Sequence, residues 1–75
     1  MNVNENKTSS ESQNGKILAW LQEGNKITQM DALNLCGCFR LASRIYDLRE
    51  RGYDIIKEMI ILPNGKRVAE YSLLP

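Results

Sequence analysis

The sequence predicts an α+β fold in which three helices are followed by a two-stranded β-hairpin. Apolar residues recur at helical spacing in three segments, and each of these segments ends near a glycine. The last third of the chain alternates apolar and polar residues around an Asn-Gly pair. With 75 residues, 43% of them hydrophobic, the chain supplies one compact core and therefore one small domain.

The first 13 residues, MNVNENKTSSESQ, are rich in Asn, Ser and Glu and contain a single valine. Such a segment cannot bury enough apolar surface to offset the conformational entropy lost on ordering. We therefore expect a disordered polar tail over residues 1–13 and a folded domain over residues 14–75.

The first expected helix covers residues 14–23. Three of its apolar side chains share one face at i, i+3 and i+4: Ile17, Trp20 and Leu21. Ser12 or Asn14 can cap its start, and Gly24 suits its end. Trp20 is a candidate stacking platform for single strands, but its helical spacing favours a place in the core.

A short extended link over residues 25–28 precedes the second helix, and its Ile27 can fill the core. Thr28 and Asp31 have the spacing of a weak capping box. The buried face of this helix is expected to hold four apolar residues: Met30, Ala32, Leu33 and Leu35. Gly37 ends the helix.

The third helix is expected over residues 39–51. Leu41, Ile45 and Leu48 form its inward stripe, and Gly52 stops it. The link between the second and third helices is only about three residues long, which is typical of a helix-turn-helix.

The hairpin is expected to have strands at residues 55–62 and 67–73, joined by Pro-Asn-Gly-Lys. Alternation makes one face of the second strand apolar, through Ala69, Tyr71 and Leu73. Two strands alone are marginally stable, so the hairpin must pack on the helices. The order helix, extended link, helix, helix, strand, strand is that of a winged helix.

The runs GCFRLASRIYDLRERGYDI and PNGKRVAEYSL resemble the small helix-turn-helix domains that are common in phage and prophage genomes. The resemblance covers about residues 15–73. It implies a winged helix and association with DNA, without implying a particular operator or a single regulatory role.

The distribution of charge also favours a polyanionic partner. The net charge of the chain is only +1, but residues 37–68 hold seven basic and four acidic side chains and so carry +3. Arg40, Arg44 and Arg51 fall within about 60° of one another on an ideal helix, away from the apolar stripe. Residues in the first half of a recognition helix reach base edges, so we expect Arg40 and Arg44 to contact bases or phosphates, with Ser43 as an accessory.

An alternative interpretation of the same residues remains open. Asp47 lies three residues after Arg44 and four before Arg51, so these side chains also have the spacing of an exposed ion-pair ladder. Such a ladder contributes little to stability. Asp47 and Glu50 are expected to be solvated or paired within the helix.

The hairpin tip carries three further candidates for DNA contact: Asn64, Lys66 and Arg67. A basic tip can clamp a phosphate or enter the minor groove, although the same residues also make a good soluble turn. Lys26 and Lys57 are additional candidates for phosphate contacts.

Several function classes have little support in the composition. Cys36 and Cys38 are the only cysteines and the chain has no histidine, so we expect no zinc site and no cofactor, and we interpret both thiols as small packing residues. We expect no enzyme, since there is no histidine base and no Gly-rich phosphate loop. No apolar run has the roughly 20 residues of a membrane span, so no membrane partner is expected.

The sequence therefore predicts a cytoplasmic, nucleoid-associated protein that binds double-stranded DNA. Its third helix would enter the major groove while the wing contacts the backbone. A transcriptional regulator or a recombination accessory factor of phage or prophage type fits this description, with pairing as a homodimer on DNA. The alternative is a winged-helix interaction module that binds a host or phage protein as an adaptor or inhibitor.

Overall fold

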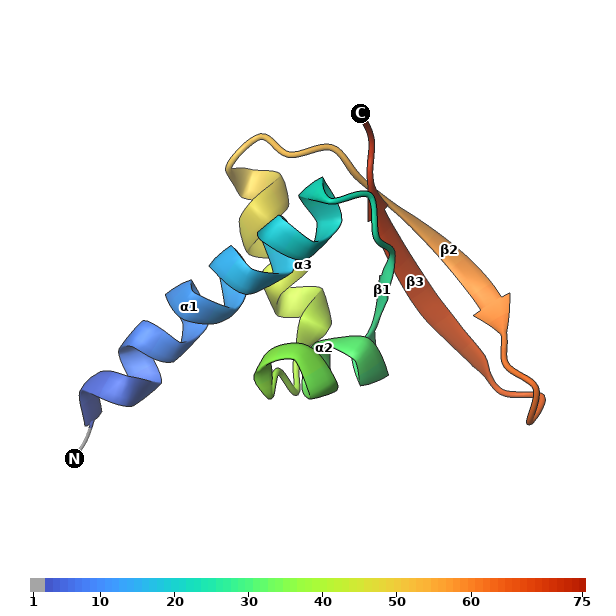
Figure 1. Cartoon of the computed structure of the whole chain (residues 1–75), viewed down its shortest axis with the longest axis horizontal. Coiled ribbons are helices and arrows are strands. Elements are labelled where there is room, and N and C mark those ends of the chain that lie inside the picture. The colour runs from blue at the N-terminus through green and yellow to red at the C-terminus, as the bar shows by residue number, and fades with distance from the viewer. Residues whose placement is uncertain (1–2) are drawn as a thin grey trace.

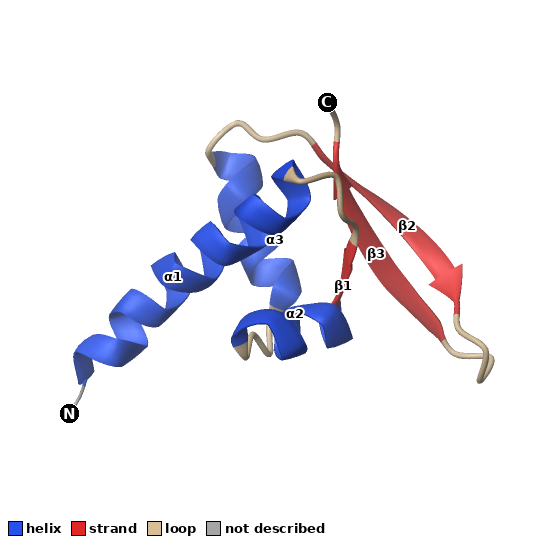
Figure 2. Cartoon of the chain, viewed as in Figure 1, coloured by secondary structure: helices blue, strands red, loops and turns tan. Residues whose placement is uncertain are grey.

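The computed structural model describes the backbone of residues 3–75 and the side chains from Ser10 onward. Along the chain lie α1 (Val3–Gln22), β1 (Ile27–Thr28), α2 (Gln29–Cys36), α3 (Leu41–Glu50), β2 (Ile55–Ile61) and β3 (Arg67–Leu73) (Figure 1). The helices gather beside the sheet, and the β2–β3 hairpin extends away from them (Figure 2). None of the helices described is long and apolar enough to cross a membrane.

The sheet has three strands, which corrects the predicted two-stranded hairpin. The extended link pairs with the hairpin, so that β1 lies antiparallel to β3 and the strand order is β1-β3-β2. Ile27 is opposite Tyr71 and both side chains are buried, which explains why the link is extended at this point. β3 is therefore the central strand, and β2 lies at an edge.

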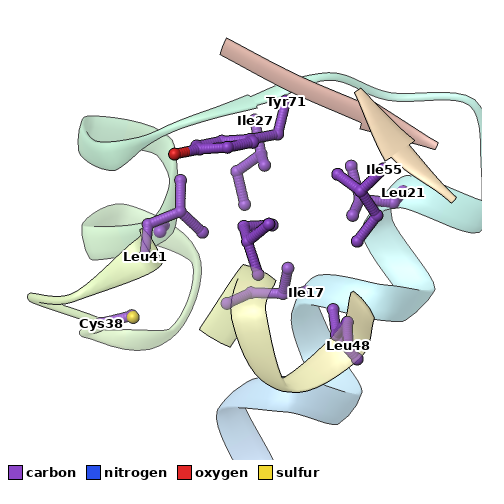
Figure 3. Close-up of a cluster of buried hydrophobic side chains, with 10 residues drawn as sticks. Ile17, Leu21, Ile27, Cys38, Leu41, Leu48, Ile55 and Tyr71 are labelled. Carbon is purple, nitrogen blue, oxygen red and sulfur yellow. The ribbon is translucent and has the colours of Figure 1, made fainter. Parts of the chain in front are cut away.

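The core lies between the helices and one face of the sheet. Side chains from α1, α3 and all three strands point toward its centre in Figure 3. The predicted inward stripe of the third helix is confirmed, since Leu41, Ile45 and Leu48 are at most 1% exposed. Ile17, Leu21 and Ile27 are likewise buried.

Two apolar residues differ in their degree of burial from the expectation. Trp20 is half-buried against the core, and its indole Nε1 donates a hydrogen bond to the Lys26 carbonyl at 3.0 Å. Met30, expected in the core, is 62% exposed. Ala32 is the fully buried residue of α2, and a separation of two positions places Met30 about 160° away from it on the helix.

The first helix is longer than predicted. It begins at Val3, whereas we expected a disordered tail over residues 1–13, of which residues 1–2 lie outside the described part of the chain. The expected boundary at residue 14 therefore falls inside α1. Ser12 and Asn14 do not cap the helix, because both lie within it. Four polar residues of this extension and the turn after it have partners on α2, on α3 or at its C-cap: Ser10, Glu11, Gln13 and Asn14. Gln13 Nε2, for example, donates to the Cys36 carbonyl at 3.4 Å.

The two turns that position the candidate site follow the sequence closely. The Thr28–Asp31 capping box is present in both directions at the start of α2. Gly37 ends α2 with a φ of 67°, in the left-handed region that favours glycine. α3 then begins at Leu41, two residues later than predicted.

Candidate nucleic-acid interface

The N-terminal end of α3 is held by a side chain from α2. Gln29 Oε1 accepts a hydrogen bond from the Leu41 amide at 2.9 Å, and Gln29 Nε2 donates to the Cys38 carbonyl at 2.6 Å. Arg40 occupies the N-cap position but makes no capping hydrogen bond with its side chain. Gln29 therefore supplies the acceptor that the cap residue does not provide, and it ties the start of α2 to the start of α3.

One side of α3 is turned toward α1, and we call it the α1-facing side: Arg44, Asp47 and Arg51. Arg44 Nη1 donates to Ser10 Oγ at 2.9 Å, and Arg44 Nη2 lies 3.1 Å from Asp47 Oδ2. The Arg44 side chain is consequently only 17% exposed. At the end of the helix, Arg51 Nη2 lies 2.7 Å from Glu11 Oε2.

A buried amide completes the contacts of this side. Asn14, which is 1% exposed, donates from Nδ2 to Asp47 Oδ2 at 3.3 Å. Asn14 Oδ1 and Arg44 Nε are buried without a hydrogen-bond partner among the described residues. The structure thus shows the predicted Arg44–Asp47 pair, but as part of an interhelical cluster and not as an exposed ladder.

A second set of residues, in α3 and just before it, is largely open to solvent, and we call it the open side: Phe39, Arg40, Ala42, Ser43 and Tyr46. Phe39 is 81% exposed and Tyr46 is 63% exposed. Arg40 and Ala42 are also exposed, and Ser43 is half-buried. Arg40 and Ser43 were predicted as contact residues, whereas Phe39 was missed. The helical angle of Tyr46 places it off the Leu41–Ile45–Leu48 stripe, in agreement with its exposure.

The hairpin brings three predicted residues together at its tip. The Leu62 amide donates to the Lys66 carbonyl, and the Gly65 amide to the Leu62 carbonyl, both at 2.8 Å. Asn64 Oδ1 accepts from the Lys66 amide at 3.0 Å, so this oxygen is engaged in the turn. Lys66 and Arg67 are exposed. The tip and the N-terminal end of α3 lie on the same lower side of the view in Figure 1.

These elements and their order match those of a known domain family. A family model described as a winged helix-turn-helix domain matches residues 12–75. The chain belongs to this winged helix-turn-helix family. Searches of curated proteins and of solved structures each found no match. Winged helix-turn-helix domains are typically DNA-binding modules without enzymatic activity, so the family supports nucleic-acid binding in general terms.

In the terms of a winged helix-turn-helix, α3 is the recognition helix and the β2–β3 hairpin is the wing. The wing's other predicted contact, Lys57, is exposed on β2. Lys26 lies just before β1, with its Nζ 3.9 Å from Glu58 Oε1 on β2. Both lysines therefore lie beside the sheet, apart from the residues of the tip.

Charge is unevenly distributed along the recognition helix. From Cys38 to Tyr46 the chain has two arginines and no carboxylate, and the acidic side chains begin at Asp47. Arg44 is paired with Asp47, so Arg40 is the arginine of this stretch with an exposed side chain. The N-terminal half of the helix is accordingly the half suited to a polyanion.

The cysteines lie at the turn between α2 and α3. Cys38 is buried and Cys36 is half-buried, and both thiols are free. Burial, and secondarily the neighbouring Cys38, raises the pKa of the Cys36 thiol above its ordinary value. Among the side chains that the structure describes, from Ser10 onward, no group of three or more potential metal ligands is found.

Proposed function

We propose that this winged helix-turn-helix domain binds double-stranded DNA with the N-terminal end of α3 in the major groove and the wing on the backbone. The observation that carries this proposal is the exposed Arg40 at the start of a helix whose first half contains no carboxylate. Gln29 orders this end of the helix before any ligand binds, which lowers the entropic cost of binding.

Within this proposal the predicted residues have different roles. Arg40 reaches a guanine edge or a phosphate, and Ser43 makes an accessory contact. Lys66 and Arg67 hold the backbone beside the groove, and Asn64 can contribute its amide nitrogen while its oxygen stays in the turn. Arg44 reaches DNA only if its guanidinium leaves Ser10 and Asp47. Lys26 and Lys57 supply outer phosphate contacts.

The biological role that we propose is transcriptional regulation or assistance of recombination, as in phage and prophage proteins. Two copies would pair on neighbouring half-sites, because helix-turn-helix domains commonly read symmetric operators in this way. The stoichiometry of the titration described next tests this pairing.

The test is an anisotropy titration of fluorescein-labelled random-sequence duplex at about 50 mM and about 200 mM KCl. The wild type should bind with a strong dependence on salt. Arg40→Ala and the double variant Lys66→Ala/Arg67→Ala should each bind more weakly, with a log–log salt slope reduced by about 0.9 for each phosphate that the variant no longer neutralises. Arg51→Ala is the matched control, because it removes the same charge from the far end of α3 and should change binding little.

Absence of duplex binding even at the lower salt concentration would overturn the proposal. The second candidate, binding of a protein partner, would then be preferred. It is favoured by large apolar side chains that lie exposed just before α3 and on the wing, where Phe39 is 81% and Ile61 is 72% exposed.

A further inference from the structure

The open side of α3 exposes two aromatic side chains, Phe39 and Tyr46, at the end that the proposed function places in the groove. Phe39 is the most exposed of the large hydrophobic residues described, at 81%. Ala42 and Tyr46, at the i and i+4 positions of α3, are exposed as well and share one face of the helix. None of the three side chains belongs to the buried core. Their exposure therefore has no explanation in the packing of the domain.

Phe39 is held in the same ordered segment as the proposed contact residue Arg40. It immediately precedes Arg40, the N-cap of α3, and both lie in the segment that Gln29 fixes through Cys38 and Leu41. Both residues are exposed, so a ligand docked at this end of α3 lies close to Phe39 as well as to Arg40. The partner must offer both an anionic or hydrogen-bonding edge and a small apolar group.

The major groove of DNA offers this combination. Its apolar feature is the C5-methyl group of thymine, which projects among the hydrogen-bonding edges of the bases and is contacted by alanine and phenylalanine side chains. We propose that Phe39, together with Ala42 and Tyr46, contacts thymine methyl groups next to the site read by Arg40; this inference rests on the proposed function. The domain would then select duplexes that are rich in thymine at these positions.

The charge of the surroundings favours DNA over a protein as the occupant of this surface. The stretch from Cys38 to Tyr46 has no carboxylate, and Arg40 is exposed within it. The major groove that displays thymine methyl groups is bordered by the phosphates of both strands, so a DNA ligand brings negative charge to a surface on which Arg40 is exposed. An apolar patch on a protein partner need not be accompanied by negative charge.

The experiment compares thymine with uracil, which keeps the same base pairing and the same O4 acceptor but lacks the methyl group. Duplexes enriched by the wild type from a random pool are resynthesised with deoxyuridine in place of thymidine. The affinities of wild type, Phe39→Ala and Leu74→Ala are measured for both forms. Leu74→Ala is the matched control, because it also removes an exposed apolar side chain, 47% exposed, but one that is joined to Asp54 beyond the other end of α3.

We expect the wild type and Leu74→Ala to bind the uracil duplex more weakly, by about fourfold for each methyl group contacted. Phe39→Ala should bind the thymine duplex more weakly and should show little of this discrimination. Circular dichroism checks that the variant remains folded, which its exposed position predicts. Equal binding of both duplexes by the wild type, or full discrimination by Phe39→Ala, would overturn the methyl contact while salt-dependent DNA binding persists. Failure of the wild type to bind any duplex would overturn the proposed function together with it.

Discussion

The α1-facing side and the open side of α3 each contain an arginine, Arg44 and Arg40, and the fold uses the two differently. On the α1-facing side, Arg44 and Asp47 are joined to each other and to Ser10 and Asn14 of α1. On the open side, Arg40 is exposed and is flanked by Phe39. An arginine four residues from another on a helix can therefore be part of an interhelical contact while its neighbour is available for a ligand. The feature that decides between them is the helix packed against α3.

The largest effect on stability is expected when a side chain of the buried Leu41–Ile45–Leu48 stripe is truncated, because this stripe supports both sides of α3. Leu48 is fully buried, so Leu48→Ala should lower the free energy of unfolding by about 2–5 kcal/mol. Tyr46→Ala, on the same helix but 63% exposed, is the control and should change it by no more than about 0.5 kcal/mol. Urea titrations measure both, and an equally large destabilisation in Tyr46→Ala would show that the open side is not open.

Replacement of Arg44 should separate stability from binding. Arg44→Ala removes the hydrogen bond to Ser10 and the pair with Asp47, and should lower the free energy of unfolding by about 1–2 kcal/mol. Arg40→Ala should change it by less than about 0.5 kcal/mol and should instead weaken duplex binding. Thermal unfolding and the salt titration are measured on both variants. The distinction between the two arginines fails if Arg44→Ala leaves stability unchanged and abolishes binding.

Removal of the Gln29 side chain should loosen the start of the open side. Gln29→Ala leaves the Leu41 amide and the Cys38 carbonyl to solvent, and should lower stability by about 0.5–2 kcal/mol, as removal of a helix cap does. Hydrogen exchange at the Leu41 amide should become faster. Gln29→Glu, which keeps an acceptor for that amide, should protect it better than Gln29→Ala; equal exchange in the two variants would contradict the capping role.

The smallest effect is expected at the exposed end of the α1-facing side. Glu11→Ala removes the carboxylate that pairs with Arg51, but both side chains are substantially exposed, at 68% and 46%. The free energy of unfolding should fall by no more than about 0.5 kcal/mol, and this difference should shrink as salt is added. A decrease comparable to that of Arg44→Ala would show that this pair is part of the buried cluster.

Patterns that are local in the sequence predicted most of the fold. The Leu41–Ile45–Leu48 stripe, the Thr28–Asp31 capping box and the Asn-Gly hairpin each depend on residues a few positions apart, and each is present. The third strand was missed because it depends on the pairing of Ile27 with Tyr71, 44 positions away. A strand of two residues is too short to show an alternating pattern in the sequence. The length of α1 was missed because Ser10 and Glu11 are held by side chains of a distant helix.

The candidate site was predicted less completely for the same reason. Arg40 and Ser43 were predicted as contact residues from their place early in the expected helix, and Lys66 and Arg67 from the turn, and all four stay predictions. The angle on the helix placed Arg44 near Arg40 but could not show that α1 covers Arg44 and leaves Arg40 exposed. Phe39 was counted as helical, and only the start of α3 at Leu41 shows that it lies outside the helix.

The hydrogen bonds of Gln29 have a consequence for how this domain can diversify. They end on main-chain atoms, the Cys38 oxygen and the Leu41 nitrogen, and not on the side chains between them. Substitution of Phe39 or Arg40 therefore leaves the presentation of the helix intact while it changes the chemistry offered to a ligand. The ligand preference of the domain can therefore change by single substitutions at these two positions, while each intermediate sequence still folds and presents α3 in the same way.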